Sequence, residues 1–192
     1  MQLEHYKQFN FDYDRKALLD LYYEYIYEFP SERNIRSPFK ALSENIDLTS
    51  HAAVSKLFDV VPAIPRKPHF SSLCELTKPV KYHCNPRNNG TIFFPVMGSL
   101  DITFYSFNPP LDNSGRPTFS PMPAERPVMT AEEQAALESS VFETVSLDKG
   151  PIAINGLKLH SYQPTSLEPP VIFVLKIPIE VNWLDVITSI GK

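Results

Sequence analysis

The sequence predicts a mainly β protein of the jelly-roll type, with N-terminal helices packed on the sheet. Eight short segments after residue 70 have the alternating or continuously apolar composition of strands, and no βαβ helices separate them. Such a series favours two packed antiparallel sheets. The last segment is apolar almost throughout, as expected of a strand covered on both faces. The predicted strands span 70–76, 78–84, 91–97, 101–107, 141–148, 151–155, 157–162 and 171–177.

Two helices are expected before the first of these strands. Between Asp14 and Phe29, apolar residues recur at three- and four-residue spacing, which is typical of a helix with one buried face. Pro30 ends this helix. The second helix is expected to begin at Thr49 or Ser50, because both are common N-cap residues.

The chain is expected to form one domain, 1–192, with a helical layer at 1–66 and a jelly-roll core at 67–192. A length of 192 residues suits a single domain with a well-buried core. Six of the 19 prolines fall in an insertion at 108–128. Loops of this length are often lids or binding loops, so the insertion is a candidate lid over substrate. A short helix, capped by Thr130, is expected to follow.

The composition excludes several classes of protein. A net charge of −4 without a Lys/Arg block argues against nucleic acid as the main partner. No apolar run approaches the ~18 residues of a membrane span, and no secretory signal is visible. Two cysteines do not make a disulfide framework. We therefore expect a cytoplasmic protein whose partner is a small-molecule or peptide substrate, with no role for nucleic acid or membrane.

Two histidines in different predicted strands are the candidate chemical groups. His83 and Asn85 are two residues apart, so an extended strand directs both side chains to one face. His160 lies in the predicted strand 157–162, which a jelly roll can bring alongside. A His-x-acid pair with a remote histidine is the facial triad that holds iron(II) and leaves positions open for oxygen and a cosubstrate. The sequence therefore suggests a metal site in which an amide takes the place of the acid.

Two segments resemble the 2-oxoglutarate- and iron(II)-dependent oxygenases. The segment His83–Pro95 is similar to their first metal-binding strand and turn, where a His-x-Asp pair precedes an arginine and an apolar strand ending in proline. The segment Gly150–Ser161 is similar to their distal stretch, where an asparagine stands five residues before the second histidine, as Asn155 does here. These matches cover about a third of the chain, in the order that the family has.

This resemblance implies a double-stranded β-helix, which is a cupin-like jelly roll, with Fe(II) held by His83, Asn85 and His160. It also implies 2-oxoglutarate as cosubstrate and hydroxylation of a small molecule or a peptide side chain. The sequence departs from the pattern at two places. Asn85 replaces the ligand aspartate, and no Arg or Lys follows soon after the distal histidine to pair with 2-oxoglutarate. An inactive or repurposed homologue is therefore a further expectation.

Three other residues are candidates for binding cosubstrate or substrate. Arg87 follows the first histidine as the family's arginine does, and Tyr105 falls on a predicted inner strand. Lys176 is the only basic residue on the last predicted strand.

Structural interpretations of the same residues stay open. A histidine in a strand is often a packed core residue, Asn85 before a proline is a good turn former, and Tyr105 suits the core. Arg87 suits a surface ion pair. A zinc site built from two cysteines and two histidines lacks the Cys-x-x-Cys spacing of known sites. Its members would be Cys74, Cys84, His83 and His69.

Two alternatives to the oxygenase-like function also remain. One is a non-catalytic binding or interaction module of the same fold, using the proline-rich loop at 108–128. The other is a cupin-like metalloenzyme that does not use 2-oxoglutarate.

Overall fold

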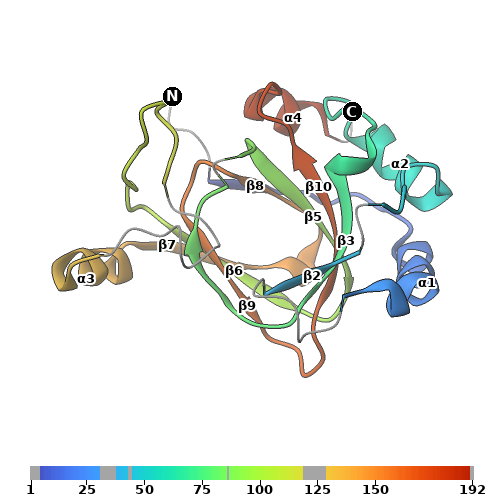
Figure 1. Ribbon diagram of the computed structural model, residues 1–192, viewed down its shortest axis with the longest axis horizontal. Helices are drawn as coiled ribbons and strands as arrows, with labels where there is room; N and C mark the ends of the chain where they lie inside the picture. The colour runs from blue at the N-terminus through green and yellow to red at the C-terminus, as the bar shows by residue number, and fades with distance from the viewer. Residues whose placement is uncertain (1–4, 31–37, 43–44, 86, 119–128, 191–192) are drawn as a thin grey trace.

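The computed structural model describes residues 5–30, 38–42, 45–85, 87–118 and 129–190. Their strands form two antiparallel sheets that face each other around a common interior (Figure 1). The six-stranded sheet has the order β1-β8-β5-β10-β3-β2, and the four-stranded sheet has the order β4-β9-β6-β7. The strands are β1 (Tyr6–Gln8), β2 (Phe39–Ala41), β3 (Ser71–Leu76), β4 (Val80–His83), β5 (Gly90–Met97), β6 (Leu100–Tyr105), β7 (Val141–Ser146), β8 (Ile152–Asn155), β9 (His160–Pro164) and β10 (Val171–Ile177).

The order in which the chain visits the two sheets confirms the predicted jelly roll. From β3 to β10 the chain alternates between the sheets, apart from the β6–β7 pair, which is antiparallel within the four-stranded sheet. Each sheet thus receives four of these eight strands, which is the arrangement of a cupin-like jelly roll. All eight predicted strands are present, and β10 has the predicted bounds.

The other seven predicted strands differ from the structure by one or more residues at their ends, and two of these differences have a local cause. The segment 157–162 becomes β9 only at His160, because Asn155 forms a turn before it. The Asn155 Oδ1 accepts the Leu157 N–H at 3.1 Å, and the Asn155 carbonyl accepts the Lys158 N–H at 3.1 Å. The segment 141–148 ends as a strand at Ser146 and continues as a short 3₁₀ helix.

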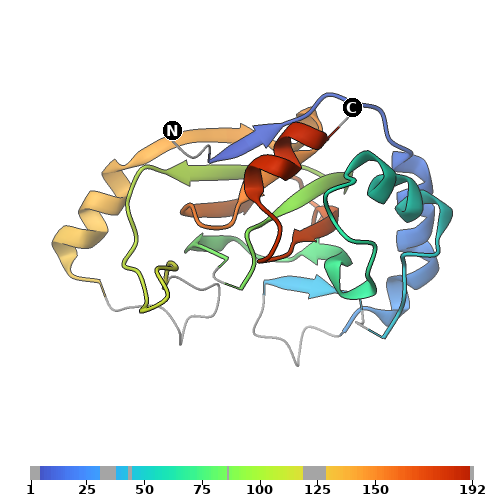
Figure 2. The ribbon, with the colours of Figure 1, turned by 90° about the horizontal axis from the view of Figure 1, so that it is seen from above.

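Three helices cover the outer face of the six-stranded sheet: α1 (Arg15–Tyr25), α2 (Ala52–Val60) and α4 (Trp183–Ser189) (Figure 2). The predicted stripe of the first helix is buried at Leu18, Leu21 and Tyr22. These helices pack against side chains that β5 and β10 direct outward, while alternate residues of the same strands fill the barrel interior. Both faces of β10 are therefore covered, which explains its continuous apolar sequence.

The N-terminal layer differs from the prediction in two respects, and the C-terminal end in one. Residues 6–8 and 39–41 are short strands at the two edges of the six-stranded sheet, so the layer is not only helical. Helix α2 is capped by His51, and neither Thr49 nor Ser50 has that role. Thr49 instead donates from its hydroxyl and its N–H to Asp47, at 2.6 and 2.9 Å. Helix α4 was not predicted.

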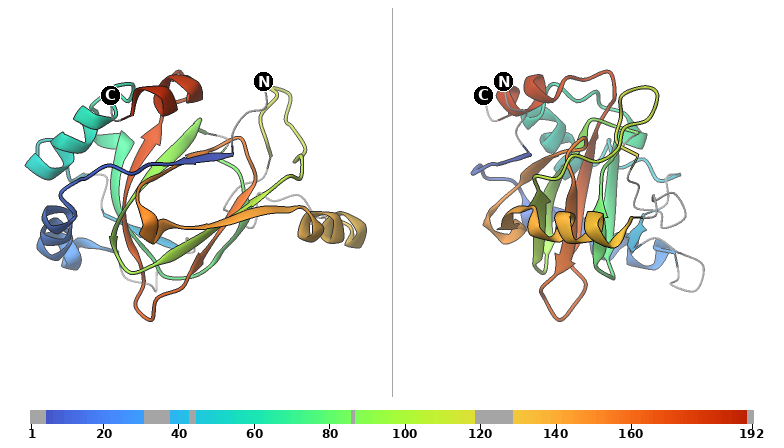
Figure 3. Two further views of the ribbon diagram at one scale, coloured as in Figure 1. Left: turned by 180° about the vertical axis from the view of Figure 1, so that it is seen from behind. Right: turned by 90° about the vertical axis from the view of Figure 1, so that its left-hand side faces the viewer.

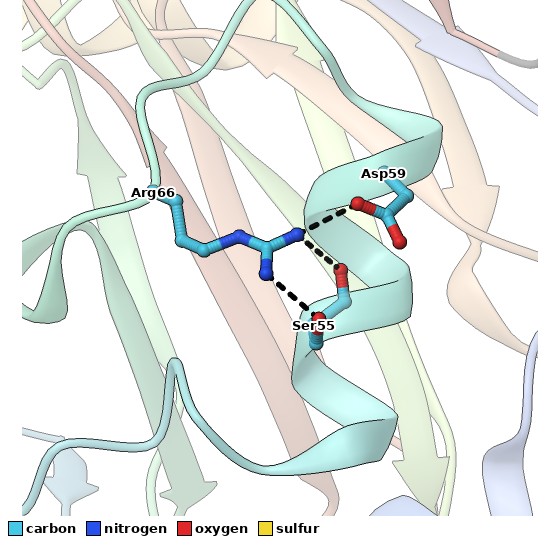
Figure 4. A network of polar contacts seen from close by, with 3 residues as sticks. All are labelled: Ser55, Asp59 and Arg66. Carbon is cyan, nitrogen blue, oxygen red and sulfur yellow. Dashed lines mark hydrogen bonds and ion pairs between the residues drawn. The ribbon is translucent and has the colours of Figure 1, made fainter.

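An arginine fixes the segment between α2 and β3 (Figure 4). The Arg66 guanidinium donates to the Asp59 carboxylate at 2.6 Å and to the Ser55 hydroxyl at 2.8 Å. A third hydrogen bond reaches the Ser55 carbonyl at 3.2 Å. These three hydrogen bonds hold the chain against the exposed face of α2. The next residues, Pro68 and His69, line the cavity described below.

Helix α3 (Ala131–Ser139) lies at the end of the molecule opposite α1 and α2 (Figures 1 and 3). Its predicted cap is present as a capping box between Thr130 and Glu133. Of the preceding insertion, residues 108–118 are described and form a turn closed by a bridge between Leu111 and Pro117. The remainder, 119–128, lies outside the described residues, so the lid stays a prediction.

Candidate metal and ligand site

Strands β4 and β9 bring the two predicted histidines together. The strands are antiparallel neighbours, and His83 and His160 are directly opposed Cα partners. Their ring centroids lie 4.4 Å apart with an interplanar angle of 63°. Both side chains are buried, with exposures of 2% and 0%. Residues 77 positions apart in the sequence therefore share one site, as the spacing suggested.

Backbone carbonyls fix the tautomer of each ring. His83 Nδ1 lies 2.9 Å from the Lys81 carbonyl, and His160 Nδ1 lies 2.7 Å from the Lys158 carbonyl. A carbonyl only accepts, so each Nδ1 carries a hydrogen, and in a neutral ring the Nε2 then presents a lone pair. Among the described residues, His160 Nε2 has no hydrogen-bond partner. Burial, and then the neighbouring His83, hold the pKa of His160 well below its ordinary value, so this ring is neutral.

Three more polar side chains surround the histidine pair. The Tyr162 ring lies 5.0 Å from His83 and 5.3 Å from His160. Burial raises the pKa of the Tyr162 phenol, and the neighbouring Asn85 and Thr91 side chains partly oppose that shift. The Thr91 hydroxyl is close enough to influence the phenol, but it makes no hydrogen bond of good geometry with any described residue. His160 and Thr91 thus leave two buried polar atoms without such a partner here.

A cavity of about 260 Å³ opens over this polar group. Its polar lining includes His83, Asn85, Thr91 and Tyr162, whereas His160 is not among the described residues that line it. Lys176 is the one lysine or arginine among the described lining residues. The other walls are mostly apolar and come from the six-stranded sheet, from the N-terminal segment and from the residues just before β3. These wall residues are Pro38, Phe39, Ala41, Leu42, Ile46, Leu48, Pro68, His69, Ser71, Ser72, Cys74, Phe93 and Val174.

The structure groups some of the predicted site residues and separates others. Asn85 and Lys176 line the cavity with His83. Arg87 lies in the exposed turn after β4 and does not line it. Tyr105 is also outside, because Phe104 takes the inward position of β6 and alternation turns Tyr105 outward, where its hydroxyl lies 2.9 Å from the Ser161 hydroxyl. Neither Arg87 nor Tyr105 is among the described residues that line this cavity, and their binding roles stay predictions.

The alternative zinc site does not form within the described residues. Cys74 lies in the barrel interior, whereas Cys84 packs in a separate cluster with Leu137 and Leu159. No group of three His, Cys, Asp or Glu side chains among the described residues is placed to hold a metal ion.

The histidine pair nevertheless suits two positions of a metal centre. Neutral imidazole nitrogen binds iron, zinc and copper well, and a buried Nε2 without a partner is an available donor. The third position is an amide, since Asn85 stands where a carboxylate would neutralise charge. The residues present thus fit a two-imidazole metal site and do not fit a complete 2-His-1-carboxylate triad.

Sequence reasoning missed Tyr162, Thr91 and the N-terminal wall of the cavity. Tyr162 was detectable, because it stands two residues after His160 and shares its face of the strand. Thr91 is the interior-facing partner of Lys176 across β5 and β10, a relation that requires the sheet register. The wall at residues 38–48 gave no periodic pattern.

Comparisons with known proteins give weak likenesses of fold. The chain matches no protein-family model and no curated protein. Among solved structures it is similar to an L-ribose isomerase from Acinetobacter sp. DL28 at 15% identity, covering 73% of this chain and 59% of that one, with a TM-score of 0.39. An L-ribose isomerase from Cellulomonas parahominis gives 14% identity, 73% and 61% coverage and a TM-score of 0.41.

A Bacillus subtilis oxalate decarboxylase is similar at 12% identity, covering 56% of this chain and 21% of that one, with a TM-score of 0.34. This chain therefore spans less than two thirds of each of these proteins. At such values we carry no chemistry over from them, and the cupin-like jelly roll is defined by the chain's own sheet order. Within the described part of the chain, no helix has the length and apolar character to cross a bilayer.

Proposed function

We propose that this chain is a 2-oxoglutarate/iron(II) oxygenase-like protein in which His83 and His160 hold a divalent metal ion. The observation that supports this most strongly is the buried, unpartnered Nε2 of a neutral His160, opposed in register to a second imidazole. Iron(II) with 2-oxoglutarate would supply oxidation of a substrate by dioxygen. The substrate would be a small molecule or a peptide side chain.

Lys176 is the residue we assign to a carboxylate of 2-oxoglutarate. It is the one cation that lines the cavity among the described residues, and its Cα partner on β5 is Thr91. The lysine ammonium group and the threonine hydroxyl can both donate hydrogen bonds to a carboxylate, and neither carries a negative charge that would repel it. The later position of this lysine in the sequence is compatible with the role, because β10 carries it into the cavity.

Asn85 weakens the metal centre in this proposal. An amide ligates poorly and leaves the charge of the ion to be balanced by the ligand, so we expect metal affinity below that of a full triad. The Asn85 side chain instead lies close enough to the Tyr162 phenol to lower its pKa. This contact favours our second candidate function, a non-catalytic binding module that uses the same cavity without a metal ion.

Anaerobic titration with iron(II), followed by 2-oxoglutarate, tests the proposal. We expect one iron(II) per chain and a weak visible charge-transfer band when 2-oxoglutarate is added. His69→Gln is the matched control, because it removes an exposed histidine at the same cavity and should leave the titration unchanged. Iron binding with no response to 2-oxoglutarate would instead favour a cupin-like metalloenzyme that does not use it. No metal uptake would leave the binding module.

A further inference from the structure

The charge of the cavity restricts what it can bind. The described residues that line it include one lysine and no aspartate or glutamate. Lys176 forms no salt bridge with another described residue. An ammonium group in a mostly apolar cavity is costly unless an anion accompanies it, and a second buried anionic charge would have no partner there. Without a metal ion, the cavity therefore suits a ligand with a single negative charge.

The anion would lie in the corner that Lys176 and Thr91 form. The two residues are Cα partners on β10 and β5, and directly opposed side chains on one face of a sheet have Cβ atoms about 5 Å apart. Thr91 is 7% exposed, and its hydroxyl lacks a well-formed hydrogen bond to the described residues. A carboxylate oxygen there would accept from both groups.

The rest of the cavity suits an aromatic body. Phe39, Phe93 and Tyr162 line it and contact one another at steep angles. The Phe39 ring lies 5.7 Å from Tyr162 and 6.5 Å from Phe93, and Phe93 lies 5.3 Å from Tyr162. Rings at such distances and angles accept a further ring edge-on or offset. Aliphatic side chains of the N-terminal segment, such as Leu42 and Ile46, complete this wall.

We infer that the cavity binds an aromatic monocarboxylate, with its carboxylate at Lys176 and Thr91 and its ring against the three aromatic side chains. The inference names the ligand class of the cavity used in the proposed function. It uses the same Lys176 that the proposed function assigns to 2-oxoglutarate, so it describes the metal-free cavity, in which the aromatic acid takes the place of that cosubstrate.

Calorimetry on metal-free, full-length protein tests the inference with three probes. They are 3-phenylpropanoate, its uncharged amide 3-phenylpropanamide, and the dicarboxylate glutarate. We expect 3-phenylpropanoate to bind with one site per chain. Its affinity should exceed that of the amide and that of glutarate by tenfold or more, because only the first matches both the single cation and the aromatic wall.

Two variants test recognition of the carboxylate and recognition of the aromatic ring separately. Lys176→Met should bring the affinities of acid and amide within about twofold of each other, because it removes the charge that distinguishes them. Lys67→Met is the control, since this exposed lysine does not line the cavity and the preference for the acid should persist. Phe39→Leu should weaken acid and amide by a similar factor. Circular dichroism checks the fold, and Lys176→Gln replaces Lys176→Met if that variant does not fold.

Three results would overturn the inference: no binding of the acid, equal binding of acid and amide, or glutarate binding as tightly as the phenyl acid. Retention of the acid's preference in Lys176→Met would do so as well. The proposed metal site fails separately, in the iron titration. Loss of iron uptake leaves the aromatic acid result intact, and iron uptake without binding of the aromatic acid contradicts only the present inference.

Discussion

Leaving one nitrogen of a buried imidazole without a partner destabilises a fold by about 1–3 kcal/mol. His160 is fully buried and has such a nitrogen, and two residues away from it on the same strand Tyr162 is buried as well. Thr91 adds a third polar group to the same small volume. Polar groups kept buried and only partly satisfied at one place are commonly found where a ligand completes the hydrogen bonding.

Asn85→Asp should tighten metal binding by tenfold or more. A carboxylate at this position supplies the negative charge that the two imidazoles lack. The metal-free protein should lose about 1–3 kcal/mol of stability, because the added charge is partly buried next to the Tyr162 hydroxyl. Calorimetric titration with zinc or iron(II) measures the first effect, and urea unfolding measures the second.

Asn113→Asp is the matched control for Asn85→Asp, because it adds the same charge at an exposed loop position. Its metal affinity should equal that of the original protein. Equal affinities in all three proteins would mean that residue 85 does not contact the ion.

The buried thiol of Cys74 should make stability fall at alkaline pH. Burial raises the pKa of Cys74 from 9.0 to about 11, although Ser72 and Lys176 oppose the shift. The folded state therefore holds this proton more tightly than the unfolded state. The protonated thiol contributes fully to the free energy of unfolding below about pH 9, and this contribution is lost as the pH rises toward about 11. Between about pH 9 and about pH 11, the free energy of unfolding of Cys74→Ala should fall by about 2 kcal/mol less than that of the original protein.

Urea unfolding at several pH values measures how the free energy of unfolding of Cys74→Ala changes with pH. Ser71→Ala is the control, because it removes no titrating group. Parallel profiles for Cys74→Ala and the original protein would contradict the assignment.

At the scale of elements, the start of β5 depends on a glycine. Gly90 has φ of +149°, and a Cβ there would lie 2.1 Å from the Ile154 carbonyl oxygen of β8. Gly90→Ala should therefore destabilise the protein by several kcal/mol, or prevent folding, because backbone must move. Gly115→Ala is the comparison: its φ is +78° with no atom within 4 Å, so only the backbone conformation is strained and the loss should be about 1 kcal/mol. Thermal unfolding measures the loss of stability of both variants. The loss in Gly115→Ala reports the strained backbone conformation, and the additional loss in Gly90→Ala reports the steric clash with β8.

The elements that the sequence predicted are those with a strong local pattern. The stripe of α1, the capping box at Thr130 and the continuous apolar run of β10 each follow from neighbours in the chain. The three-residue strands β1 and β2 are too short to show a period, and only pairing with β8 and β3 makes them strands. The His83–His160 pair was predictable as two members of a spaced motif. The residues that line the cavity beside this pair were not predictable, because they come together through the sheet register and through the course of residues 38–42 and 45–48.

For the molecule as a whole, the jelly roll supports the cavity from two sides. Alternate residues of β5 and β10 belong to two different cores, one inside the barrel and one under the helices. The strands that carry Thr91 and Lys176 are therefore fixed by packing on both faces. The opposite sheet carries the histidines, so a ligand in the cavity would bridge the two sheets.

This arrangement predicts that a ligand on the histidines stabilises the entire fold. A metal ion at about 100 times its dissociation constant adds about 2.7 kcal/mol if it binds only the folded state. For a chain of this length that raises Tm by about 5–10 °C. His160→Leu should abolish the rise. The metal-free variant should stay within about 1 kcal/mol of the original protein, because removing the unpartnered nitrogen offsets the hydrogen bond lost to the Lys158 carbonyl.

His160→Ala separates packing from chemistry in this experiment. It should also abolish the metal-dependent rise in Tm, and it should lose about 2–4 kcal/mol without metal, because it leaves a cavity among buried rings. Calorimetric scans with and without zinc or iron(II) measure both quantities. A rise in Tm that persists in both variants would place the ion elsewhere, since no imidazole would remain at this position to bind it.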